Sequence, residues 1–88
     1  MHIDGPNDST YEMDSRSDLT FFIYALQDDL RQHPENWENQ DLHTFLGAFA
    51  RFLNDAHGYY RNEELDINAD VPSWRLFADC LQTATCYD

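Results

Sequence analysis

The feature that most constrains this chain is a run of apolar residues between positions 42 and 56. The residues recur at intervals of three and four, which is the repeat of one face of an α-helix and differs from the alternation of a β-strand. The run consists of Leu42, Phe45, Leu46, Phe49, Phe52, Leu53 and Ala56. It predicts an amphipathic helix of about four turns that ends at Gly58, a residue suited to a left-handed C-cap.

The other side of this helix is unusually small, because it carries Gly47, Ala48 and Ala50. A glycine in a helix interior costs about 1 kcal/mol relative to alanine, and a closely packed neighbour would justify that cost. Two interpretations stay open. Either this helix is the central element, covered on both sides within one copy of the chain, or its small side is the contact with a second copy or another partner.

Two further amphipathic segments flank the central one. Before it, Ser15 and Asp18 form a capping pair, and Pro34 stops the helix that they start. The apolar stripe of that helix holds Leu19, Phe22, Ile23, Leu26 and Leu30. After the central helix, Pro72 is expected in the first turn of a third helix. The buried side of the third helix is predicted to hold Trp74, Leu76, Phe77, Cys80, Leu81 and Ala84.

The two connections between these helices differ in length and charge. Residues 33–39 form a short connector, in which we expect Trp37 to fold back onto the core and Asn39 to cap the next helix. Residues 59–71 form a long acidic loop around the isolated Leu65 and Ile67. This loop has room for a short hairpin.

Three amphipathic helices on one core predict an all-α fold, a compact three-helix bundle with the long acidic loop between its second and third helices. With 88 residues, the chain has room for one folded domain. We assign residues 15–88 to this domain. Residues 1–14 hold a glycine, a proline and several acids without periodicity, and are predicted to form a flexible acidic arm.

Charge is the second strong constraint. Seventeen Asp and Glu residues face five Arg and no Lys, which gives a net charge of −12. Such a chain repels phosphates, so we expect no direct binding to nucleic acid and an attraction to a basic protein. The alternative is that the acidity serves solubility alone. The sequence has no apolar run long enough for a membrane span and no secretory signal in its first residues, and its two cysteines read as reduced thiols. The expected location is the cytoplasm.

The sequence offers no motif for catalysis, metals or cofactors. Asp66, Asn68 and Asp70 copy the first ligands of a calcium loop, but Val71 stands where the turn requires glycine and Phe77 where a glutamate belongs. The histidines lack zinc-binding spacing, and no glycine-rich phosphate loop is present. We therefore predict a protein that is not an enzyme and has no cofactor.

If the protein binds a partner, its contact surface should combine acids with exposed aromatic residues. The first predicted surface is centred on Tyr60, whereas Tyr59 is expected to cover the end of the bundle. Its acids follow Tyr60 in the chain and are Glu63, Glu64 and Asp66. The second predicted surface lies beside Trp37 in the connector and at the start of the central helix. Its acids are Glu35, Glu38 and Asp41.

Several short motifs resemble a family of short bacterial proteins of unknown function. They are Trp37-Glu38-Asn39, the stretch from Asp55 through Gly58-Tyr59-Tyr60, and Pro72-Ser73-Trp74 followed by Phe77-Ala78-Asp79. The resemblance covers about residues 17 to 87 and implies a fold, with no catalytic residue to carry over. A looser similarity, over residues 37–42, is to barstar, a small acidic ribonuclease inhibitor. That similarity implies only an analogy, because the alternating apolar strands of the barstar fold are missing here.

These observations together predict a small acidic protein-binding module. The leading hypothesis is an inhibitor or immunity-type protein that sequesters a basic partner, such as a protein that itself binds nucleic acid. The alternative is a structural adaptor or homo-oligomer in which the charge keeps the protein soluble. The chain is expected to be a monomer or a weak homodimer, with no contact to membranes.

Overall fold

The structure is a computed structural model, and it describes residues 13–87. Its helices are α1 (Arg16–Gln32), α2 (Leu42–Asn62) and α3 (Trp74–Ala84), and a short 3₁₀ turn, η2 (Pro34–Asn36), follows α1. The described residues contain no strand, so the predicted all-α three-helix bundle is confirmed. The predicted arm falls mainly on residues 1–12, outside the described residues. Within residues 13–87, none of the helices combines the length and apolar character that a membrane crossing requires.

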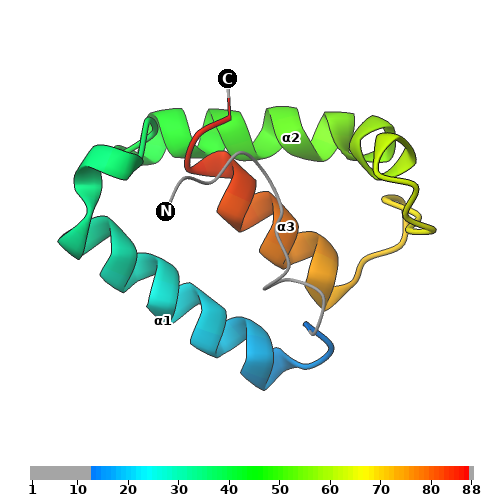
Figure 1. The fold of residues 1–88 in the computed structure, drawn as a ribbon, viewed down its shortest axis with the longest axis horizontal. Helices are drawn as coiled ribbons and strands as arrows, with labels where there is room; N and C mark the ends of the chain where they lie inside the picture. The colour runs from blue at the N-terminus through cyan, green and yellow to red at the C-terminus, as the bar shows by residue number, and fades with distance from the viewer. Residues whose placement is uncertain (1–12, 88) are drawn as a thin grey trace.

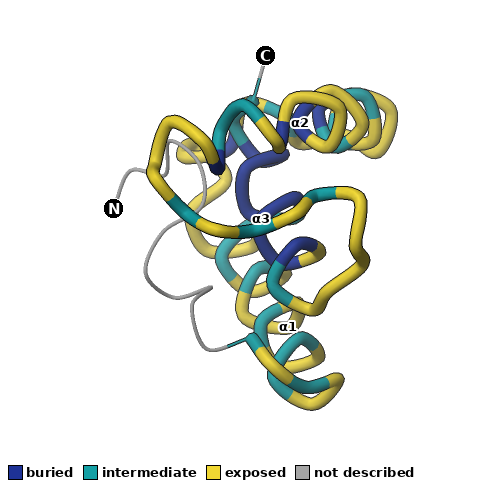
Figure 2. Tube along the Cα trace, turned by 90° about the vertical axis from the view of Figure 1, so that its right-hand side faces the viewer, coloured by how far each residue is buried: buried dark blue, intermediate teal, exposed yellow. Residues whose placement is uncertain are grey.

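The helix at the centre of the bundle is α3, not α2 as one interpretation of the sequence held. It runs between α1 and α2 and packs against both of them (Figure 1). Most of the buried residues of the trace lie on α3 (Figure 2). The reason is side-chain size, because α3 contributes small residues that let two helices approach it closely. These residues are Ala78, Cys80, Thr83 and Ala84.

The helix starts follow from local capping groups. Ser15 caps α1, because its side-chain oxygen accepts a hydrogen bond from the Asp18 N–H at 3.0 Å, as predicted. Asp41, rather than the predicted Asn39, caps α2, and its Oδ1 accepts from the Thr44 N–H at 2.8 Å. Ser73 caps α3, so Pro72 lies before that helix and not in its first turn.

The predicted end of α2 at Gly58 is wrong, because the helix continues for another turn to Asn62. The residue in left-handed conformation is Glu64, with φ 58°. Two backbone hydrogen bonds close the end of the helix: the Glu64 N–H donates to Arg61 O at 3.1 Å, and the Leu65 N–H donates to Tyr60 O at 2.8 Å. This pattern is a Schellman motif, with glutamate in place of the usual glycine. The acidic loop is correspondingly shorter and forms no hairpin.

The loop after α2 is tied to the core by its few apolar side chains. Leu65, Ile67 and Ala69 pack against the cluster formed by α2 and α3. The predicted return of Trp37 to the core is also confirmed, since Trp37 is buried, its ring stacks on Phe45, and its indole N–H donates to Asp29 Oδ2 at 2.8 Å.

The predicted apolar faces are only partly buried. On α2 the buried residues are Ala48, Phe52, Ala56 and Tyr60. Leu42, Leu46 and Leu53, which were predicted to be buried, expose 72%, 56% and 43% of their surface. The physical reason is that α2 packs mainly against one helix, and one neighbour covers only part of a wide apolar arc.

The other two helices also differ from their predicted burial. No residue of α1 is fully buried, and Ile23 of its predicted apolar stripe is exposed. On α3 the predicted core residues Trp74 and Phe77 are exposed, while Asp79 and Gln82 are buried in their place. Leu76, Cys80 and Ala84 are buried as predicted.

Candidate functional site

Tyr60 and Asp79 form a buried polar contact between α2 and α3. The Tyr60 hydroxyl donates to Asp79 Oδ2 at 2.6 Å, and Arg75 Nε donates to the same oxygen at 3.3 Å. Burial, and then the hydrogen bond to the carboxylate, raise the pKa of Tyr60 well above its ordinary value. Tyr60 exposes only 1% of its surface, so its predicted role as an exposed aromatic anchor is wrong. Its side chain joins the two helices instead.

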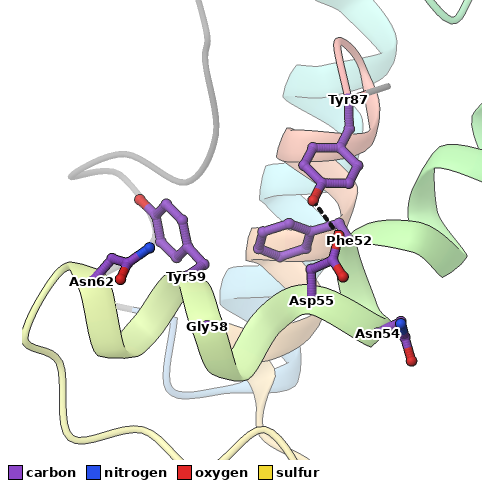
Figure 3. Close-up of a pocket in the computed structure, with 7 residues that line it drawn as sticks. All are labelled: Phe52, Asn54, Asp55, Gly58, Tyr59, Asn62 and Tyr87. Atoms are coloured by element: carbon purple, nitrogen blue, oxygen red, sulfur yellow. Dashed lines mark hydrogen bonds between the residues drawn. The ribbon is translucent and has the colours of Figure 1, made fainter.

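The residue before it, Tyr59, is half-buried and lines an open pocket beside α2. Three aromatic rings meet there edge to face, with Phe52 between Tyr59 and Tyr87 (Figure 3). The ring centres of Phe52 and Tyr59 are 5.8 Å apart, and those of Phe52 and Tyr87 are 5.5 Å apart. We call this site, with Asp55 at its wall, the aromatic pocket. Its volume is about 540 Å³.

One carboxylate stands among these rings. The Tyr87 hydroxyl donates to Asp55 Oδ2 at 2.5 Å. This hydrogen bond, together with a smaller effect of burial, raises the pKa of Tyr87 above its ordinary value. The bond holds the exposed Asp55 side chain beside Tyr87 (Figure 3). Asn54, Gly58 and Asn62 complete the lining.

Helix α2 and the segment after α3 build the aromatic pocket together. Phe52, Asp55, Tyr59 and Asn62 recur at three- and four-residue steps and therefore share one side of α2. Tyr87 arrives from beyond α3, and the side-chain amide of Asn39 holds its segment in place. That amide donates to Ala84 O at 2.8 Å and to Tyr87 O at 3.0 Å. Asn39 therefore cross-links two segments and does not form the predicted helix cap.

Gly58 lines the pocket and has no side chain to fill it. It lies inside α2, and a Cβ placed there would have no atom within 4 Å. The missing side chain leaves the pocket wall open next to Tyr59.

The acids predicted to bind a partner lie at two separate places. Glu63, Glu64 and Asp66 are exposed in the segment after α2, and Glu63 directly follows Asn62 of the pocket wall. Glu35, Glu38 and Asp41 are exposed near the other end of α2. A helix of 21 residues is about 30 Å long, so the two groups do not form one surface. The hydrogen bond from the Thr44 N–H lowers the pKa of Asp41, which fits its role as a cap.

Tyr59, Asp55 and Tyr87 are not among the binding residues predicted from the sequence. The step of seven residues from Phe52 to Tyr59 would have placed both on one side of α2 once the helix was known to continue through Gly58. No such signal exists for Tyr87, because it lies outside every helix and no periodicity applies to it.

Other reactive groups of the described chain are accounted for by structural contacts. Both cysteines are free, and burial raises the pKa of the Cys80 thiol to about 12, with a smaller contribution from Asp79. Among residues 13–87, no three His, Cys, Asp or Glu side chains are grouped so that they could hold a metal ion. Asn68 Oδ1 accepts from the Asp70 N–H at 2.9 Å and lies 3.1 Å from His57 Nε2.

Comparison with known proteins identifies a family but no individual relative. No curated protein and no solved structure matches the chain. The family described as "Family of unknown function (DUF7660)" matches residues 15–88. Because this match covers most of the chain, the protein belongs to that family of unknown function.

Proposed function

We propose that this protein binds a basic protein partner, and that a lysine or arginine side chain of the partner enters the aromatic pocket. The observation that carries this proposal is the combination of three aromatic rings with the Asp55 carboxylate in one open pocket. Ring faces attract cations, and the attraction amounts to about 0.5 to 2 kcal/mol depending on exposure. A carboxylate beside them adds a charge-assisted hydrogen bond to the same cation.

The acids around the pocket support the same type of partner. Glu63 and Glu64 are exposed just beyond Asn62, and the whole chain carries a net charge of −12. A field of this sign speeds the approach of a positively charged protein. In this proposal the long-range charge steers the encounter, and the aromatic pocket gives the contact its specificity.

An inhibitor or immunity-type role follows naturally from this mode of binding. A small acidic domain that covers the basic surface of an enzyme or a nucleic-acid-binding protein acts by occupancy alone. The side chains of the pocket need only bind and orient one cationic group. The proposal therefore assigns no reaction to the protein.

The proposal can be tested with three short peptides that differ in one side chain. Ac-Gly-Arg-Gly-NH₂ and Ac-Gly-Lys-Gly-NH₂ are titrated into isotopically labelled protein, and the NMR signals of the Tyr59 and Tyr87 rings are followed. The third peptide has citrulline in place of arginine, which keeps the shape and removes the charge. We expect both cationic peptides to shift the ring signals and the citrulline peptide to leave them nearly unchanged.

Two protein variants provide the matched controls. Asp55→Asn keeps the size of the side chain but removes the charge, so it should weaken binding of both cationic peptides. Tyr24→Leu changes an exposed aromatic residue on α1, away from the pocket, and should leave binding unchanged. Equal shifts with arginine and citrulline would contradict the proposal. So would shifts confined to Trp74, which lines a separate pocket with Met13 and Phe77.

A further inference from the structure

The exposed side of α2 carries an apolar stripe that no part of residues 13–87 covers. Leu42, Leu46, Ala50 and Leu53 follow one another at steps of four, four and three residues, so they form one line along the helix. All four are exposed, although three are large aliphatic residues. Contiguous exposed apolar surface of this kind is typical of association sites. We call these four residues the leucine stripe.

Charge indicates what can cover the leucine stripe. From Leu42 to Asn54 the sequence has no Asp, Glu or Lys, and it has one arginine, Arg51. Two copies of a chain with net charge −12 repel each other over most of their surface. This segment is the longest stretch of the sequence without an acidic residue, so two copies that meet along it bring no acidic side chains of this stretch together.

From these two observations we infer that two copies of the chain pair through the leucine stripe, with their α2 helices antiparallel about a twofold axis near Phe49 and Ala50. In this arrangement Leu46 lies against the partner's Leu53, and Leu42 lies near the partner's His57. Ala50 falls close to the axis, where its small side chain allows the two helices to come close together. The same patch is used on both copies, as a twofold interface requires.

The ends of α2 favour the antiparallel arrangement. Glu38 and Asp41 are exposed at the N-terminal end of the helix, and Arg61 is exposed near its C-terminal end. Antiparallel pairing brings Arg61 of each copy to the acidic end of the partner's helix, and it also opposes the two helix dipoles. A parallel pair would instead place the two acidic ends side by side.

The inferred interface differs from the one suggested by the sequence and leaves the aromatic pocket open. Ala48, part of the predicted small-residue contact, is buried inside the bundle and cannot reach a second copy. Only Ala50 of that predicted set belongs to the leucine stripe. By helical spacing, Asp55 and Tyr59 lie on a different side of α2 from the stripe. Self-association and binding at the pocket are therefore independent, and each can be tested without the other.

Sedimentation equilibrium of the full chain tests the inference at low and high salt. We expect a weak dimer that becomes stronger as salt rises, because screening reduces the repulsion between two acidic copies. Binding of a basic partner should show the opposite salt dependence. Leu46→Glu should raise the dimer dissociation constant by on the order of 100-fold, because the twofold axis places each charge in the interface twice. Phe21→Glu, at a residue 75% exposed on α1, is the control and should leave it unchanged.

A charge swap tests the orientation of the pair. Arg61→Glu alone should weaken the dimer, and adding Glu38→Arg to the same chain should restore it if the helices are antiparallel. Circular dichroism checks that each variant folds. If Leu46→Glu does not fold, Leu42→Glu takes its place in the test. A wild-type chain that stays monomeric at the highest concentration would overturn the inference. A dimer that is indifferent to charges in the leucine stripe would overturn it as well.

Discussion

Helices α2 and α3 contrast in how far their sequence pattern agrees with their burial. The strongest apolar periodicity of the chain belongs to α2, yet only four of its 21 residues are buried, and three of its leucines face outward. In α3, seven of 11 residues are buried, among them Asp79 and two other polar side chains. The comparison teaches that periodicity predicts where a helix forms, whereas the size of its residues decides how many neighbours can cover it.

The largest difference in stability is expected when one buried and one exposed side chain of α2 are each truncated to alanine. Phe52 is buried in the core, so Phe52→Ala should lower the free energy of unfolding by about 3 to 5 kcal/mol. Leu46 belongs to the exposed stripe, so Leu46→Ala should change the free energy of unfolding by less than about 0.5 kcal/mol at low protein concentration. Urea denaturation measures both values. Similar losses from the two variants would show that the burial of α2 is wrongly assigned.

A smaller loss is expected where α2 and α3 meet through polar groups. Tyr60→Phe removes the hydroxyl that donates to Asp79 and leaves the ring in place. A hydrogen bond to a charged group contributes about 1.5 to 3 kcal/mol, so we expect a loss of that size in urea denaturation. Tyr87→Phe removes an exposed hydrogen bond to Asp55 and serves as the control, with a loss of under about 1 kcal/mol. A larger loss from Tyr87→Phe than from Tyr60→Phe would contradict the central position of α3 in the bundle.

The buried thiol of α3 should make stability depend on pH. Burial raises the pKa of Cys80 to about 12, while a thiol in the unfolded chain has a pKa of about 8.5. The folded state then holds its proton where the unfolded state loses it. The resulting stability is complete below pH about 8.5 and decreases as pH rises toward 12, with a loss of about 2 kcal/mol at pH 10.

Thermal unfolding between pH 7.5 and pH 10 measures this effect, with Cys80→Ala as the matched variant. That variant starts from a lower stability but should lose less of it as pH rises. Because tyrosines also begin to titrate near pH 10, the comparison depends on the difference in slope between the two proteins. Parallel slopes would mean that Cys80 is accessible to solvent in the folded protein.

The smallest effects are expected at the two glycines inside α2. A Cβ at Gly58 would meet nothing within 4 Å, so Gly58→Ala should stabilise the helix by up to about 1 kcal/mol. At Gly47 a Cβ would lie 3.1 Å from Nη1 of Arg51, which must move, so Gly47→Ala should gain less. The shift in melting temperature measures both. A destabilising Gly58→Ala would contradict the continuation of α2 through this residue.

Much of the fold could be predicted from local signals in the sequence. The start of α1 at Ser15 and its end before Pro34 depend on capping and backbone geometry within a few residues, and both were predicted correctly. The end of α2 was missed because Glu64 adopts the left-handed conformation that glycine usually takes. The central position of α3 was missed because it depends on how closely two other helices can approach, which no single segment encodes.

The candidate site was less predictable than the fold, because it depends on contacts between distant segments. Phe52 and Tyr87 are 35 positions apart in the chain, and the segment of Tyr87 is held by Asn39 from a third region. The acids after α2 were visible in the sequence, but the roles of the two neighbouring tyrosines were interchanged: Tyr60 was predicted to bind a partner, and Tyr59 was predicted to cover the end of the bundle. Tyr60 turned inward because α2 continues past Gly58, and Tyr59 therefore became the pocket residue.

An intermolecular NOE experiment with Ac-Gly-Arg-Gly-NH₂ shows whether the aromatic pocket holds a cationic side chain. We expect contacts from the arginine side-chain protons to the rings of both Tyr59 and Tyr87, and we expect Asp55→Asn to weaken these contacts. Contacts confined to other parts of the surface, or contacts of equal strength in the Asp55→Asn variant, would contradict binding of the cationic side chain in the aromatic pocket.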